Sequence, residues 1–195
     1  MGTIESSKRW GLAVAAAVCA SAFFSSSAGA ALIGPRNISD AASDGSYAGG
    51  CTYSNVQLSE GKVRSPFTGE IERWRVNIGE PHDAFVDDGP LRLQVLKRTA
   101  NQPGVVNDEF QAVRQTGEQS VTPGGEPQAF NSGLRIRKGQ FIGVDIAADT
   151  EVQEKDVSPA YLFFWCPSLT PAAPVVDPTF KQENVTLLFN ATVKR

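Results

Sequence analysis

Short runs of alternating apolar and polar residues are the feature that most limits what this 195-residue chain can fold into. Over 70–78, Trp74 and Val76 alternate with Arg73 and Arg75. The same period recurs at 91–96, 134–137, 141–146 and 185–193. An alternating run buries one face and exposes the other, which is typical of antiparallel strands. The runs therefore predict strands, and the last of them predicts one continuous strand.

Glycine and proline separate these runs. Turn signals lie at 65–66, 88–90, 102–104, 123–125 and 138–139. The segment 161–165 is apolar on both faces, which favours a central strand, and the prolines between Pro167 and Pro178 favour an extended crossing loop. No stretch after residue 31 keeps a helical period between caps. We therefore expect an all-β domain, an antiparallel β-sandwich of roughly eight to ten strands with jelly-roll-like connections.

The first thirty residues have the pattern of a helical, cleavable signal peptide. Lys8 and Arg9 precede an uncharged apolar run over 10–24, and Ala28-Gly29-Ala30 supplies small residues for a signal peptidase. The run is shorter than the roughly 20 residues of a membrane-spanning helix. We expect cleavage before Ala31, a flexible lead-in over 31–50 and a single domain over 51–195, secreted and without membrane contact after cleavage.

Two cysteines remain once the expected signal peptide is removed. Cys51 opens the predicted domain, and Cys166 directly follows the predicted central strand. Export favours oxidation, so we expect a Cys51–Cys166 disulfide. The alternative is two unrelated buried thiols, because a free cysteine behaves as a small hydrophobic residue.

The composition excludes several function classes. With His82 as the single histidine, the chain cannot assemble the usual zinc or copper sites, and we expect no cofactor. The formal net charge of −3 lacks the basic stripe of a nucleic-acid binder, so no nucleic-acid partner is expected.

Four segments carry a resemblance to a known group of proteins: 65–76, 91–97, 133–145 and 187–193. In these strands and turns the chain resembles uncharacterised secreted β-sandwich domains of actinobacteria. The resemblance covers residues 51–195 and implies export and a β-sandwich. It implies no activity, so no functional residue is transferred from that group.

Acidic residues form two candidate metal sites. Asp83, Asp87 and Asp88 lie with His82 in a loop between two predicted strands, and their carboxylates could meet a calcium ion. The spacing does not match a twelve-residue calcium loop, so a solvated acidic turn is favoured. A second run over 151–156 is interpreted as an exposed loop.

Glu70 and Glu72 are the candidate ligand-binding carboxylates, with Trp74 beside them. On a regular strand all three side chains would share one face, which conflicts with burial of Trp74 unless a bulge intervenes or the indole is partly exposed. Two carboxylates beside a tryptophan could form a sugar cleft. An edge strand with its charges facing water is the favoured alternative.

These observations predict an exported, non-catalytic domain that binds a carbohydrate or an extracellular protein surface, or that has a structural role outside the cell. The alternative is a secreted glycan-active hydrolase that uses paired carboxylates. No residue is assigned a catalytic role, because the sequence has no Gly-x-Ser-x-Gly elbow and His82 is the single candidate base.

Overall fold

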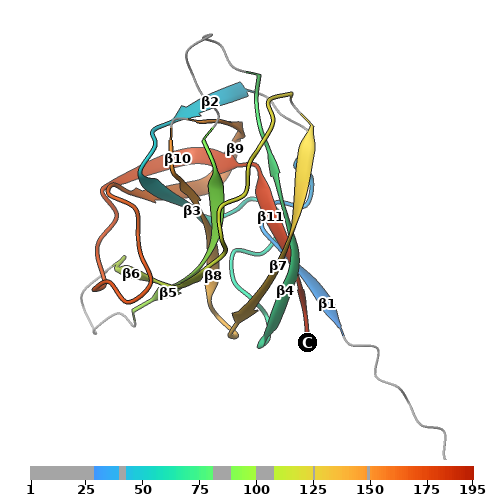
Figure 1. Cartoon of the computed structure of the whole chain (residues 1–195), viewed down its shortest axis with the longest axis vertical. Helices are drawn as coiled ribbons and strands as arrows, with labels where there is room; N and C mark the ends of the chain where they lie inside the picture. Colours follow the sequence, from blue (N-terminus) through green and yellow to red (C-terminus); the bar gives the residue numbers. More distant parts are fainter. Residues whose placement is uncertain (1–28, 40–42, 81–88, 100–107, 125, 149) are drawn as a thin grey trace, which may run out of the picture.

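The computed structural model describes residues 29–39, 43–80, 89–99, 108–124, 126–148 and 150–195. Within them, eleven strands form two antiparallel sheets packed as a sandwich (Figure 1), as the alternating runs predicted. The strands are β1 (Ala30–Ile33), β2 (Ser43–Tyr47), β3 (Cys51–Gln57), β4 (Gly69–Asn77), β5 (Leu91–Arg98), β6 (Phe110–Gln115), β7 (Pro127–Ile136), β8 (Phe141–Ile146), β9 (Thr150–Trp165), β10 (Phe180–Leu187) and β11 (Phe189–Lys194).

The strand pairing follows a jelly roll. One sheet has the order β1-β11-β4-β7 and the other β10-β9-β3-β8-β5-β6, with β2 paired to β9. The pairs β5–β6, β4–β7, β3–β8 and β1–β11 are nested, and successive pairs alternate between the sheets. This nesting is the jelly-roll arrangement expected from the sequence. Strands β9 and β10 extend the larger sheet beyond β3.

The core lies between the sheets and takes its side chains from the apolar face of each strand. Ile71, Trp74 and Val76 of β4 belong to one core cluster with Leu93 and Val95 of β5, and all five are fully buried. Burial of such a face is the main stabilising contribution to a sandwich, at about 25 cal/mol per Å² of apolar surface. The predicted strands at 70–78 and 91–96 are confirmed.

The larger sheet is also buried on its outer face, where the alternation predicted contact with solvent. Leu96 and Phe141 form a second cluster there with Phe110 and Trp165. The predicted crossing loop runs between β9 and β10 and covers this face. Its Val176 exchanges two backbone hydrogen bonds with Phe110, of 2.9 and 3.0 Å. We expected the outer faces of β5 and β8 to contact solvent. This was wrong, because the loop covers these faces and excludes water from them.

A bulge interrupts β4 at the predicted ligand-binding residues. The register shifts between Ile71 and Arg73 against β7, and the same two residues flank a shift against β11. Glu72 is the extra residue against β11, so Ile71 and Trp74 both face the core although three positions separate them. Of the two alternatives, the bulge is correct and exposure of Trp74 is not.

The predicted continuous strand over 185–193 is in fact two strands. β10 ends at Leu187 in the larger sheet, β11 begins at Phe189 in the smaller one, and the chain changes sheets at Leu188. Leu187 and Phe189 are both buried in the central core. The alternation of apolar and polar residues continues across the change of sheet, because both sheets face the same core.

The segment 31–50, expected to be a flexible lead-in, contains two of the strands. Ala31 pairs with Val193 of β11, and Ile33 is fully buried. In β2 the buried Tyr47 ring lies edge-on to Tyr53 at 4.8 Å. The sandwich therefore includes strands before Cys51. Of the signal peptide expected over 1–30, residues 1–28 lie outside the described residues, and Ala30 begins β1. No helix in the described part of the chain is long and apolar enough to cross a membrane.

The disulfide between Cys51 and Cys166 is present, with the two Cα atoms 4.6 Å apart. Thr52 pairs with Trp165 across β3 and β9, so Cys51 and Cys166 are the next opposed positions on the same ladder. A separation of about 4.5 Å is that of a non-hydrogen-bonded antiparallel pair. The bridge therefore joins two neighbouring strands at the point where each meets a loop.

Candidate anion-binding site

The structure separates Trp74 from the two glutamates predicted to lie beside it. Trp74 is fully buried, with its ring centroid 5.0 Å from that of Phe130. Glu70 and Glu72 are exposed, and Glu72 forms an ion pair with Lys194. A stacking platform needs an accessible aromatic face, which this indole does not offer. The three residues therefore do not form a sugar cleft.

Of the two acidic segments considered as metal sites, the structure describes one. His82, Asp83, Asp87 and Asp88 lie outside the described residues. The run over 151–156 belongs to strand β9, not to an exposed loop, and Glu151 is buried. In the described segments, no three His, Cys, Asp or Glu residues gather in a group that could hold a metal ion.

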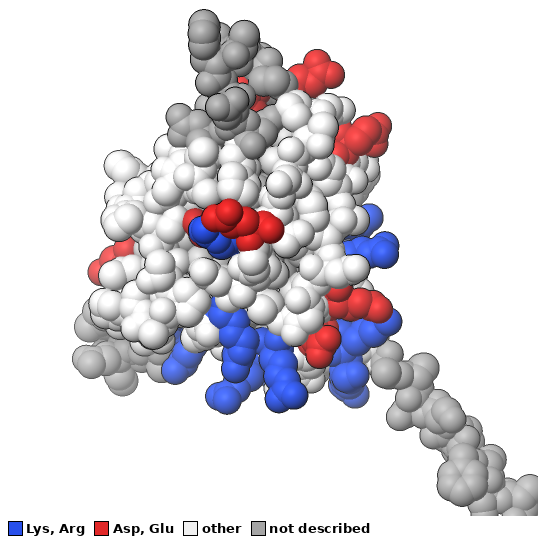
Figure 2. Space-filling view, viewed as in Figure 1, with Lys and Arg blue, Asp and Glu red and all other residues white. Residues whose placement is uncertain are grey.

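A cavity of about 480 Å³ lies where the β5–β6 edge faces the turn between β7 and β8. Its described lining contains five cationic side chains and no carboxylate. Figure 2 shows Lys and Arg side chains projecting together from the lower end of the molecule. We call this cavity the basic pocket; its lining residues are Lys97, Arg98, Gln111, Val113, Arg114, Arg137, Lys138, Gly139 and Gln140.

A bulge in β6 brings Arg114 to this pocket. The register between β5 and β6 shifts so that Leu96 faces Ala112 while Val95 faces Arg114, which leaves Val113 as the extra residue. Opposed residues project from the same face of a sheet, and Val95 faces the central core. Arg114 thus shares the inner face with Val95 and, at the strand end, with Lys97. Without the bulge it would project from the opposite face.

The turn that carries Arg137 and Lys138 is held by hydrogen bonds on both sides. The Arg137 N–H donates to the buried Gln140 Oε1 at 2.6 Å, and the Lys138 N–H donates to Thr68 Oγ1 at 3.2 Å. Gly139 has a φ of 85°, a conformation that residues with a Cβ rarely adopt. The backbone beneath the two cations is therefore fixed, while their side chains are exposed.

Most cations of the pocket have no ion-pair partner among the described residues. Arg98 forms an ion pair with Asp108. Within the described residues, Lys97, Arg114, Arg137 and Lys138 form no ion pair. Four uncompensated cations around one cavity are a local excess in a chain whose formal net charge is −3. A concave site of one sign concentrates ions of the opposite sign, so this pocket is suited to an anion.

Comparisons with protein-family models, with curated proteins and with solved structures each found no match. The chemistry of the described residues is therefore the basis for the functional conclusion.

Proposed function

We propose that this chain is an exported, non-catalytic binding domain that holds an anionic group of an extracellular carbohydrate in the basic pocket. The observation that carries the proposal is the set of five cations around a cavity whose described lining has no carboxylate. Arginine donates two parallel hydrogen bonds to a carboxylate, sulfate or phosphate, and lysine adds a compact charge. Acidic sugars present these anionic groups.

Three observations support export. The sequence over 1–30 has the charged, apolar and small-residue order of a signal peptide. The Cys51–Cys166 disulfide is consistent with an oxidising compartment. The strands and turns resemble secreted β-sandwich domains of actinobacteria, and membership of that group is part of the proposal.

An acidic carbohydrate fits the charge distribution better than a nucleic acid does. Nucleic-acid binders carry a basic stripe or face that follows a phosphate backbone. Here the uncompensated cations gather at one cavity of a chain that is acidic overall. Such a site suits a carbohydrate whose anionic groups are spaced along its chain, so that the pocket binds one or two of them at a time.

The test is calorimetric titration of the purified protein with polygalacturonate, chondroitin sulfate and neutral dextran. We expect binding of at least one acidic polymer, none of dextran, and weaker binding as salt rises. The double substitution Arg137→Gln/Lys138→Gln should lower the affinity by about ten-fold or more, because each charge-assisted hydrogen bond contributes about 1.5–3 kcal/mol.

The matched control is Lys62→Gln/Arg73→Gln, which removes two exposed cations outside the pocket lining. If the two double variants lose the same affinity, the effect is due to net charge alone, and the pocket is refuted as the binding site. Preference for duplex DNA over both acidic polymers would also refute the proposal. Release of reducing ends from either polymer would favour the hydrolase instead.

A further inference from the structure

Arg98 lines a second cavity as well as the basic pocket. This cavity has a volume of about 300 Å³ and lies on the outer face of the larger sheet. We call it the aromatic pocket; its lining residues are Val56, Gln57, Arg98, Asp108, Tyr161, Phe163 and Lys181. Because one side chain contributes to both walls, the two cavities are neighbours at the end of β5.

The aromatic pocket offers a ring, and both of its cations pair with Asp108. Tyr161 and Phe163 are two residues apart on β9 and so project from the same face. Phe163 is buried, and the Lys181 ammonium lies over its ring at 5.0 Å from the centroid. Tyr161 is only partly buried, so its ring is the accessible one. The negative face of an aromatic ring attracts the polarised C–H groups of a sugar.

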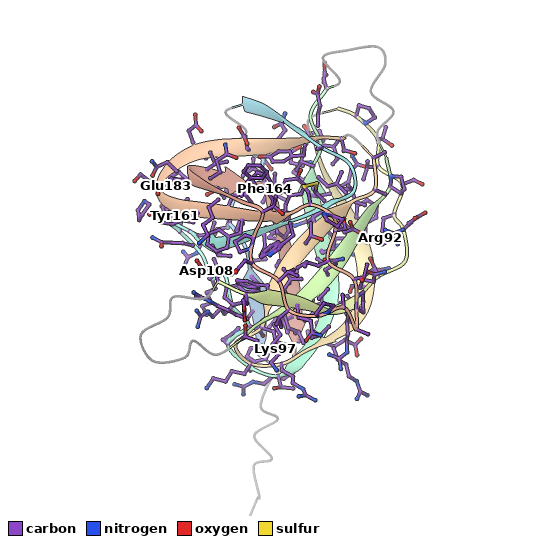
Figure 3. All side chains as sticks on the ribbon, turned by 90° about the vertical axis from the view of Figure 1, so that its left-hand side faces the viewer. Arg92, Lys97, Asp108, Tyr161, Phe164 and Glu183 are labelled. Carbon is purple, nitrogen blue, oxygen red and sulfur yellow. A yellow bond between two sulfur atoms is a disulfide. The ribbon has the colours of Figure 1, made fainter. Side chains whose placement is uncertain are left out.

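Asp108 fixes the boundary between the two cavities. Its carboxylate accepts hydrogen bonds from Arg98 and from Lys181, whose Nζ lies 2.6 Å from Oδ2. The Asp108 side chain is 11% exposed and that of Arg98 is 27% exposed, so the carboxylate is the more buried partner of this ion pair. Figure 3 shows Asp108 between Tyr161 and Lys97 along one side of the molecule. A ligand that leaves the basic pocket past Arg98 would therefore reach Tyr161.

We infer that the two cavities are adjoining subsites for one extended acidic polysaccharide. An anionic group occupies the basic pocket, and the ring of a neighbouring sugar stacks on Tyr161 past Arg98. This inference rests on the proposed function and names its ligand class, an oligomer rather than a single acidic sugar. It predicts that affinity depends on chain length, and that Tyr161 contributes only when the ligand is long enough.

The test compares galacturonate with hexagalacturonate, with a chondroitin sulfate hexasaccharide in parallel. Tyr161→Ala should weaken binding of the preferred hexamer by about two- to ten-fold, the range of an aromatic stacking contribution, and leave monomer binding unchanged. Tyr161→Phe should keep native affinity, because it keeps the ring. Arg137→Gln/Lys138→Gln should weaken binding of both lengths.

Phe180→Ala is the matched control, because Phe180 is 59% exposed on β10 and lies outside both cavities. If Phe180→Ala and Tyr161→Ala weaken the hexamer equally, the Tyr161 subsite is wrong. If hexamer and monomer bind equally well and Tyr161→Ala has no effect, the inference fails while the basic pocket stands. If the native protein binds neither length, the proposed function fails as well. Urea unfolding of Tyr161→Ala must show a native-like transition, and Tyr161→Phe tests the ring should Tyr161→Ala not fold.

Discussion

Removing the disulfide should lower the free energy of unfolding by about 4–5 kcal/mol. The bridge links residues 115 positions apart. In the chain-entropy relation, closing a loop of that length removes about 16 cal/mol/K from the unfolded chain, or about 4.8 kcal/mol at 25 °C. The folded state should change little, because β3 and β9 are held by their own ladder, which runs from Thr52–Trp165 to Gln57–Tyr161. The melting temperature should fall by about 10–20 °C.

The variant is Cys51→Ala/Cys166→Ala in the chain expected after cleavage before Ala31, which lacks Cys19 and so has no thiol for exchange. Urea unfolding can be followed by the fluorescence of Trp74 and Trp165, which are both buried. The parent protein, once its disulfide is reduced with dithiothreitol, should unfold at the same urea midpoint as the variant. A loss below about 1 kcal/mol would refute the entropic argument, and two titratable thiols in the unreduced, unfolded parent would refute the bridge itself.

Two further predictions concern buried side chains. Trp74→Ala should cost about 3–5 kcal/mol of unfolding free energy, whereas Trp74→Phe should cost less than half as much. Among the described residues its Nε1 has no hydrogen-bond partner, so phenylalanine loses no bond there; denaturant unfolding measures both. Burial, and then the hydrogen bond to Glu154, raises the pKa of Tyr47 above its usual 10.0. Since the folded pKa is the higher one, the stability it contributes is present below pH 10 and is lost as the pH rises further. The parent should therefore lose stability between pH 9 and 11 more steeply than Tyr47→Phe, in urea titrations at each pH.

The sandwich could be predicted from sequence because strand alternation is a local property. In β4 the sequence pattern also indicated that the strand is not regular. A regular strand would place Glu70, Glu72 and Trp74 on one face, and burying the indole there would bury two carboxylates as well. Burial of unpaired carboxylates is too costly, so a bulge was one of two possible solutions. The structure has that bulge at Glu72, in the pairing of β4 with β11.

Features that depend on distant segments could not be predicted in the same way. The outer face of β5 contains Gln94, which is fully buried although glutamine usually marks a solvated face. Its amide donates to the Leu169 carbonyl at 2.7 Å, in the loop that covers this face. The loop itself was predicted from its prolines, but its position over β5 is set by contacts across the fold. The change of sheet at Leu188 could not be predicted either. The alternation of buried residues continues across it, so the sequence pattern shows no interruption.

The candidate site shows the same limit more sharply. The glutamates of β4 attracted attention because they are close in sequence, whereas the basic pocket draws on three separated segments. Lys97 and Arg98 end β5, Arg114 lies on β6, and Arg137 and Lys138 form the turn after β7. Alternation alone assigns Arg114 to the wrong face, because the bulge beside it is not visible as a pattern. The one local signal was the Lys138-Gly139 turn, which places a cation on an exposed turn without indicating its neighbours.

The arrangement of these cations has a consequence for the free protein. The turn backbone is held by Gln140 and Thr68, so the backbone of Arg137 and Lys138 stays beside the other cations that line the pocket. Like charges that are held close repel one another, and the fold must offset this cost elsewhere. An anion in the pocket replaces repulsion with attraction, and it binds a site that exists only in the folded chain. By linkage, the same ligand therefore stabilises the fold in proportion to its affinity. A purely structural surface gains nothing from gathering cations that have no ion-pair partner among the described residues, and this supports the proposed binding role.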